Sequence, residues 1–400
     1  MDIIKGDPEF AREINKSLIL DYLRRKEKVS RVDIARALNL TKGTISTIVS
    51  GLINEKLVVE IGEGLPKKQG GRKPVLLSLN PFDKYVIGID IGTTSIVIAL
   101  SNLKGEVLKK SRIPTSNKKF VENITRQVKI LVKEMIADFN IKTGRVIGCG
   151  ISVAGVVEKN NGYIVVSPDF NWKDIPIKKI FEEAIGLDIV CDNCTRVMTL
   201  GEKWYGLAKN VKDGFFVNVG YGIGSAIIIN GEIYNNHSEF GHVFITKKQV
   251  QCDCGKFGCL EAISSGHAIE REAYKLINGK HNKEEKVITA KRVAELANQG
   301  NKVAKQIFLD AGKYLGRAIS MVANTFNPEI IILGGGVSLA GQLFFDPVIE
   351  EFRKQTMEPI LQRTKIEITK LGMDAGVLGA IALALNSYIF KPESIYMAKD

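Results

Sequence analysis

The chain opens on a run in which apolar residues recur every three or four positions. This spacing predicts a first helix over residues 11–25, whose buried face carries Ile14, Leu18, Ile19, Tyr22 and Leu23. Ser30, with Asp33 three residues on, predicts the start of a second helix. After a short turn, Thr41 is placed to cap a third helix. Two helices joined by so short a turn predict a helix-turn-helix.

The second helix of such a pair enters the major groove of DNA by its N-terminal residues. We therefore expect Lys42, Thr44, Ser46 and Thr47 to contact DNA, because an ammonium group seeks phosphate and small hydroxyls reach base edges or phosphates. The alternative is a third helix that only completes a three-helix bundle.

Beyond residue 57 the apolar period shortens to two. Residues 57–61 and 74–79 are predicted to be the two strands of a wing. Their connection holds four basic residues among glycines: Lys67, Lys68, Arg72 and Lys73. A flexible basic hairpin tip suits a DNA groove or phosphate backbone, although a solvated linker has a similar composition.

From residue 81 onwards, apolar strands alternate with Gly-rich turns and helical segments. The motif Asp90-Ile91-Gly92-Thr93-Thr94 lies between two predicted strands, where backbone N–H groups and hydroxyls can meet a phosphate and the aspartate a metal ion. An ordinary hairpin is the alternative. A second strand, Gly-rich turn and strand follow over 214–231, which suggests two duplicated lobes that face each other across a cleft.

One short segment gathers a histidine and three of the six cysteines: His242, Cys252, Cys254 and Cys259. Three thiolates and an imidazole fill a tetrahedral zinc site and leave no position for an activated water, so a structural Zn²⁺ is expected. Buried, inert cysteines with a chance disulfide are the alternative.

Composition restricts the class of protein. The chain has 400 residues, 45% hydrophobic and 25% charged, as in soluble globular proteins of two or three domains. Charged residues interrupt the N-terminus where a signal peptide would be apolar, and the most apolar stretches are shorter than a membrane span, so a cytoplasmic protein without membrane contact is expected. The net charge of +12, of which residues 1–80 contribute fifteen Lys and Arg against ten Asp and Glu, permits a polyanionic partner.

Taken together, the motifs resemble the ROK family (repressors, open reading frames, kinases) over nearly the whole chain. They are the 90–94 motif, the glycines of 220–224, Glu239 to His242, the cysteine segment up to Glu261, and Gly334 to Gly336. The resemblance implies a winged helix-turn-helix domain plus an α/β actin-like, sugar-kinase-like (ribonuclease H-like) body of two lobes. The layout is similar to the xylose repressors of that family.

The implied domains are 1–80 for the DNA-binding head, 81–195 for the first lobe and 196–374 for the second. A C-terminal helix at about 375–388 is expected to pack back on the first lobe. The second lobe is expected to hold the zinc loop and a dimer interface, for which a helix over 302–325 is one candidate and core burial of that helix is the alternative.

The resemblance also indicates which catalytic parts are missing. Kinases of the family use an Asn-Asp pair whose aspartate is the general base; here Asn193 is kept and Cys194 takes the aspartate's place. A thiol is mostly protonated at pH 7 and is a poor base. Tyr221 stands where the kinases carry a small hydroxyl residue, and the 231–242 segment is short. We therefore expect no catalysis.

The sugar side is better preserved. Glu239, His242 and Glu261 match the family's sugar-contacting positions, and surface charge is the alternative for the two carboxylates. Gly155 resembles a turn whose backbone approaches the sugar, and Asn193 completes the set. Asp169 stands where the family has an asparagine, near Trp172, for which a core role is equally compatible.

The functional hypothesis is a sugar-responsive repressor of carbohydrate-utilisation genes, in which a monosaccharide, xylose-like as a first guess, binds between the lobes and weakens operator binding. A homodimer or dimer of dimers is expected, because helix-turn-helix proteins read two half-sites. The alternatives are a ROK-type ATP-dependent sugar kinase with a DNA-binding head, and a regulator that senses a transporter component.

Overall fold

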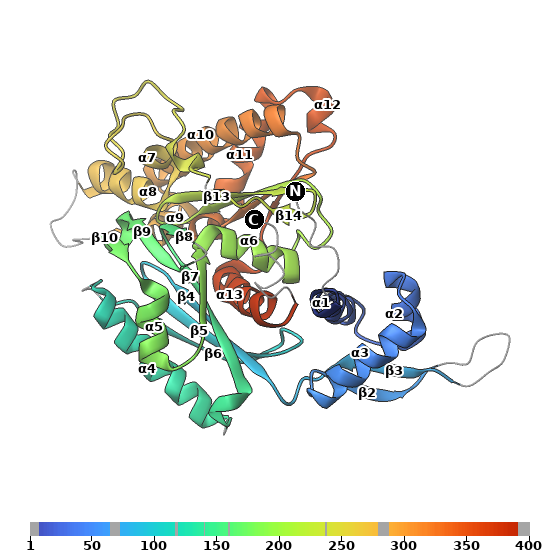
Figure 1. The fold of residues 1–400 in the computed structure, drawn as a ribbon. Helices are drawn as coiled ribbons and strands as arrows, with labels where there is room; N and C mark the ends of the chain where they lie inside the picture. Colours follow the sequence, from blue (N-terminus) through green and yellow to red (C-terminus); the bar gives the residue numbers. More distant parts are fainter. Residues whose placement is uncertain are drawn as a thin grey trace.

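The computed structural model describes residues 8–64, 73–116, 119–139, 141–158, 161–236, 238–278 and 288–390. A small N-terminal head lies beside a larger body built on two β-sheets (Figure 1). Lys67, Lys68 and Arg72 of the predicted basic loop lie outside the described residues.

The head is a winged helix-turn-helix. Its elements are α1 (Pro8–Lys26), β1 (Val29–Ser30), α2 (Arg31–Leu38), α3 (Lys42–Asn54), β2 (Val58–Glu63) and β3 (Val75–Leu79). Ser30 and Asp33 form a capping box that begins α2, and Asn39 ends α2 in the left-handed conformation. Thr41 Oγ1 accepts a hydrogen bond from the N–H of Thr44 at 3.1 Å and begins α3. The wing has one strand more than predicted, because β1 pairs with β3 through Val29 and Leu77.

The first lobe is a five-stranded sheet with the order β11-β7-β4-β5-β6. Its strands are β4 (Tyr85–Ile91), β5 (Ser95–Asn102), β6 (Val107–Pro114), β7 (Val146–Val153) and β11 (Ile189–Asn193). Odd-numbered isoleucines of β4 pack against α4 (Val121–Asp138) and α5 (Ile177–Ile185), whereas even-numbered residues face α13 (Ala375–Leu385). Both faces are covered, which is why these strands appear as unbroken apolar runs.

Glycines allow α13 to lie directly on this sheet. A Cβ at Gly150 would lie 2.1 Å from the carbonyl oxygen of Ala380, and one at Gly88 would lie 2.7 Å from that of Val377. The helix Gly372–Phe390 is long and apolar enough to cross a membrane, but 61% of its apolar window is buried inside the protein, as expected of a core helix.

A second, smaller sheet of the first lobe carries part of the site. It contains β8 (Val156–Glu158), β9 (Tyr163–Ser167) and β10 (Trp172–Ile175) in the order β10-β9-β8. Trp172 is a core residue, 5% exposed, and its Nε1 donates a hydrogen bond to the carbonyl oxygen of Lys119.

The second lobe repeats the topology of the first. Its sheet has the order β14-β13-β12-β15-β16, with β12 (Gly214–Val219), β13 (Ile223–Ile229), β14 (Glu232–Ile233), β15 (Ile330–Gly334) and β16 (Lys365–Ile368). In both lobes an antiparallel three-strand unit is extended by two parallel strands. The duplicated sheets confirm the actin-like α/β fold.

The helices of the second lobe cover the outer face of its sheet. They are α7 (Glu261–Ser264), α8 (Gly266–Ala273), α9 (Ala290–Asn298), α10 (Lys302–Phe326), α11 (Gln342–Gln355) and α12 (Glu358–Leu361). Helix α10, which was one candidate for the dimer interface, packs against α11, and eleven of its residues are buried.

Helix α6 (Cys194–Tyr205) runs between the two sheets (Figure 1). It crosses α13 at very short range, because a Cβ at Gly379 would lie 1.9 Å from the carbonyl oxygen of Val197. On its other side, Met198 packs against the apolar cluster that contains Phe216 and Ile332 of the second sheet. Helix α6 therefore contacts both halves of the body.

The head is joined to the body by a shared core. Ile19, Leu20 and Leu23 of α1 belong to the same apolar cluster as Ile381 and Phe390 at the end of the chain's described part. The hydroxyl of Ser17 donates to the carbonyl oxygen of Phe390. The Arg24 guanidinium lies 4.2 Å from the ring centroid of Trp204, at the end of α6.

Candidate functional site

Four predicted metal ligands come together at the edge of the second lobe. One ligand atom each from His242, Cys252, Cys254 and Cys259 lies within 4.8 Å of the other three. The loop closes through isolated antiparallel bridges that pair 244 with 259 and 251 with 257. Gly255 and Gly258 adopt positive φ angles, of 86° and 76°, which explains why glycine stands at both turns.

The spacing of these atoms fits a tetrahedral metal. Cys254 Sγ lies 3.7 Å from Cys259 Sγ, and Cys252 Sγ lies 3.6 Å from His242 Nδ1. A Zn–S bond of about 2.3 Å places two sulfurs of a tetrahedron about 3.8 Å apart, whereas a disulfide needs about 2.05 Å. All six cysteines are free, so the chance disulfide is excluded.

Glu261 connects this loop to the Gly-rich turn of the second sheet. Its Oε2 accepts a hydrogen bond from the N–H of Ile223 at 2.7 Å, and its Oε1 lies 4.0 Å from His242 Nδ1. A Cβ at Gly222 would lie 2.5 Å from Oε2, so the turn needs glycine there. Glu261 is therefore built into the site. Glu239 is different: its side chain is 63% exposed, with Oε2 3.8 Å from His242 Nε2.

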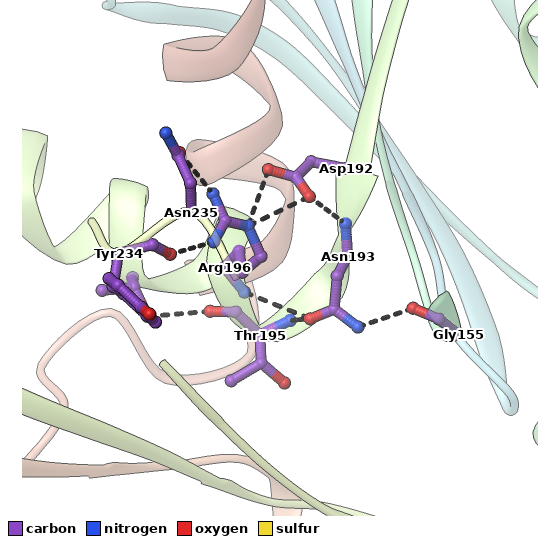
Figure 2. Close-up of polar contacts among 8 residues, drawn as sticks. Gly155, Asp192, Asn193, Thr195, Arg196, Tyr234 and Asn235 are labelled. Atoms are coloured by element: carbon purple, nitrogen blue, oxygen red, sulfur yellow. Dashed lines mark hydrogen bonds and ion pairs between the residues drawn. The ribbon is translucent and has the colours of Figure 1, made fainter. Parts of the chain in front are cut away.

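Asn193 and Gly155 meet on the first-lobe side (Figure 2). Asn193 Oδ1 accepts from the backbone N–H groups of Thr195 and Arg196, at 2.9 and 3.3 Å, and so caps α6. Asn193 Nδ2 donates to the carbonyl oxygen of Gly155 at 2.8 Å. The amide predicted to contact sugar is thus largely used by the protein, which leaves one Nδ2 hydrogen for a ligand.

Three acid groups lie around the start of α6. Burial raises the pKa of the Cys194 thiol to about 12, and the neighbouring carboxylates of Asp90 and Asp169 raise it further. Burial also raises the pKa of Asp90 to about 6, against a hydrogen bond that Ser152 Oγ donates at 2.7 Å and the charge of Arg112. The pKa of Asp169 is raised by burial and by Glu261. A thiol with so high a pKa stays protonated at neutral pH.

A small, open pocket lies between Asp169 of the first lobe and the Gly-rich turn and metal loop of the second lobe. Asp169 lines it from the first lobe, while Tyr221, Glu261, His267 and Arg271 line it from the second. Tyr221 projects from the second Gly-rich turn, and its hydroxyl is hydrogen-bonded to His267 Nδ1, with the two rings edge to face at 4.8 Å between centroids. Of the predicted sugar-binding residues, Asp169 and Glu261 line this pocket.

The predicted DNA-reading residues lie on the outer face of α3. Lys42, Ser46 and Thr47 are exposed, and the hydroxyl of Thr44 is hydrogen-bonded to that of Thr41 at 2.9 Å. Lys73, at the base of the wing loop, lies 3.6 Å from Glu63. The β2–β3 hairpin extends away from the helices (Figure 1).

Sequence reasoning missed His267 and Ser152, and it did not predict the ion pair between Asp192 and Arg196. The i, i+4 spacing of Asp192 and Arg196 was a signal for an ion pair, and their Nε and Oδ2 atoms lie 3.0 Å apart. The partner of Tyr221, His267, had no local signal because it lies 46 residues further on.

The comparisons with known proteins match this architecture. A model of the ROK family matches residues 86–387. The xylose repressor of Caldicellulosiruptor bescii is 32% identical over 97% of this chain and 99% of its own, and that of Bacillus subtilis is 29% identical over 97% and 99%. A glucokinase of Halalkalibacterium halodurans is 31% identical, over 74% of this chain and 94% of its own.

Two solved structures also divide into a regulator that matches the whole chain and a kinase that matches its body. A ROK family transcriptional regulator, described as a homologue of the E. coli MLC protein, has a TM-score of 0.82, 24% identity, and covers 97% of this chain and 99% of its own. A ROK family glucokinase from Streptomyces griseus, in complex with glucose and AMPPNP, has a TM-score of 0.66 and 27% identity over 75% and 98%. Because the family model matches most of the chain, this chain belongs to the ROK family.

Proposed function

We propose that this protein is a sugar-responsive transcriptional repressor of carbohydrate-utilisation genes. The observation that carries the proposal is a winged helix-turn-helix head fused through a shared core to a ROK body. Proteins named xylose repressors are similar to it from end to end, so xylose or a sugar of similar shape is the first candidate effector. Sugar bound between the lobes weakens operator binding, and the protein acts in the cytoplasm as a homodimer or dimer of dimers.

The site argues against a kinase. Cys194 stands where the catalytic aspartate of the kinases would be, and its thiol, with a pKa of about 12, cannot take a proton from a sugar hydroxyl at neutral pH. Tyr221, hydrogen-bonded to His267 Nδ1, stands on the second Gly-rich turn, where the family's kinases carry a small hydroxyl residue. The glucokinases match only the body of this chain, whereas the xylose repressor of C. bescii matches the head as well as the body.

The metal site serves the sugar site. Zinc held by His242, Cys252, Cys254 and Cys259 would be structural, because four protein ligands close its coordination shell. With Nδ1 of His242 turned to the metal, Nε2 is left for a ligand hydroxyl. Glu261, two residues past the last cysteine, is oriented by the same loop.

Helix α6 provides a route from the sugar to the head. Its first turn carries the Asn193 cap beside Gly155, and its last turn places Trp204 under Arg24 of α1. A shift of α6 at the cleft would therefore be transmitted through α1 to the DNA-reading helices. To move the equilibrium between the DNA-binding and the released conformation from 1:99 to 99:1, the sugar must bind one conformation more tightly than the other by about 5.5 kcal/mol.

The test is an operator-binding titration. Purified protein is expected to shift a fragment of DNA from upstream of its own gene at low salt, and xylose is expected to reverse the shift. Failure to bind that fragment, with or without sugar, would contradict the repressor. A coupled assay with ATP and a panel of sugars tests the kinase; turnover near 1 s⁻¹ or above would establish it instead.

A further inference from the structure

A buried arginine that the proposed function has not used lies at the junction of the two lobes. Arg196, in the first turn of α6, is only 6% exposed. Its Nε donates to both carboxylate oxygens of Asp192, at 3.2 and 3.0 Å. Its Nη1 donates to the carbonyl oxygen of Tyr234, and its Nη2 lies 3.4 Å from Asn235 Oδ1 (Figure 2).

These partners come from different lobes. Asp192 is in β11, the edge strand of the first sheet, whereas Tyr234 and Asn235 directly follow β14, the edge strand of the second. One guanidinium therefore joins the two sheet edges. The side chains of Arg196 and Asp192 are 7% and 8% exposed, so solvent and salt screen the pair weakly.

The same turn of helix holds residues of the proposed sugar site. The N–H of Arg196 donates to Asn193 Oδ1, and the N–H of Asn193 donates to Asp192 Oδ1 at 2.7 Å. Thr195, between them, presses on the second sheet, since a Cβ at Gly224 would lie 2.2 Å from its Oγ1. The side chain of Arg196 therefore reaches the backbone N–H of Asn193 through two hydrogen bonds, both accepted by Asp192 Oδ1.

The geometry requires an arginine. A planar guanidinium presents donors in several fixed directions and can bond Asp192, Tyr234 and Asn235 together. A lysine ammonium keeps the charge that Asp192 needs, but as a compact point charge it cannot span the three acceptors. Arg196→Lys thus separates the interlobe contact from the loss of a buried charge.

We propose that Arg196 is an interlobe positioning residue, which holds Asn193 and Gly155 in register with the second lobe and so sets the affinity for the ligand. The part about ligand affinity rests on the proposed function; the interlobe contact does not.

The first arm of the test needs no ligand. Hydrogen exchange, measured by mass spectrometry on full-length protein, is expected to be at least tenfold faster at residues 232–236 in Arg196→Lys than in the wild type. The control is Arg317→Lys, because Arg317 donates to Glu351 at 2.9 and 3.2 Å within the second lobe alone. Unchanged exchange at 232–236 in Arg196→Lys would overturn the interlobe contact, whatever the protein's function.

The second arm measures xylose binding by calorimetry. We expect a dissociation constant at least tenfold higher in Arg196→Lys and unchanged in Arg317→Lys. Equal sugar affinity in wild type and Arg196→Lys would overturn the positioning role. A wild type that binds none of a panel of sugars would instead contradict the proposed function, and the exchange measurement alone would then decide on the contact.

Discussion

The contact between Gly222 and Glu261 allows a sharp test of how the metal loop is tied to the second lobe. Replacing Gly222 by Ala places a methyl carbon 2.5 Å from Glu261 Oε2, and the carboxylate must move by roughly 0.9 Å to reach the 3.4 Å of an ordinary contact. Gly222 does not have a positive φ, so the alanine backbone itself is not strained. The perturbation is therefore confined to the carboxylate.

The displacement breaks the 2.7 Å hydrogen bond from the N–H of Ile223 to Glu261. A hydrogen bond to a charged group contributes about 1.5–3 kcal/mol, so the free energy of unfolding should fall by about that amount. Since Glu261 also leaves its place in the pocket, sugar binding should weaken as well, by roughly 10- to 150-fold if the same free energy is lost.

The assay compares Gly222→Ala with Gly220→Ala in the same turn. A Cβ at Gly220 has no neighbour closer than 3.7 Å, and its φ is not positive either. Urea denaturation of the zinc-loaded proteins, followed by xylose calorimetry, measures both effects. If the two variants unfold at the same urea concentration and bind sugar equally, the link between Glu261 and the turn is not what orders the site.

The remaining predictions concern the metal, a buried acid and the route to the head. Replacing Cys252 or Cys254 by Ser should remove bound zinc, measured by mass spectrometry. The variant should lose its response to sugar while it still binds the operator; normal sugar affinity in zinc-free protein would contradict this. The pKa of Asp90 is raised from 3.8 to about 6, so between about pH 4 and 6 the unfolded chain binds fewer protons than the folded one. The free energy of unfolding should therefore fall by about 3 kcal/mol as pH rises through that window, relative to Asp90→Asn, with no further change above it; parallel urea-midpoint profiles of the two proteins would refute the assignment. Trp204→Leu removes the ring under Arg24, a contact that contributes about 1–2 kcal/mol, and should reduce the effect of xylose on operator affinity about 5- to 30-fold while sugar binding is kept; an unchanged response in fluorescence anisotropy would exclude this route.

Much of the head could be predicted because its signals are local. The capping box of Ser30 and the cap of Thr41 define helix starts within a few residues, and both are present in the structure. The third wing strand could not be predicted, because Val29 and Ser30 form too short a segment to show a period. Their strand exists only through pairing with Leu77 and Leu76, which lie far along the chain.

The candidate site divides in the same way. Residue type and spacing were sufficient to select the predicted metal ligands, because Cys252, Cys254 and Cys259 share one short loop and His242 lies only ten residues before it. For Asn193 the resemblance to the ROK kinases suggested ligand contact, whereas the fold uses most of its side-chain amide to cap α6 and bind Gly155.

The sequence by itself determined most of the elements, the duplicated lobes and the ligand set of the predicted metal site, because hydrophobic period, helix caps and ligand spacing all act over a few residues. Only the tertiary structure decided how these parts cooperate. Arg196 becomes an interlobe contact, and Trp204 a support for Arg24, when strands and helices distant in sequence are packed together. Such contacts depend on the long-range arrangement of both sheets around α6, which no local pattern encodes.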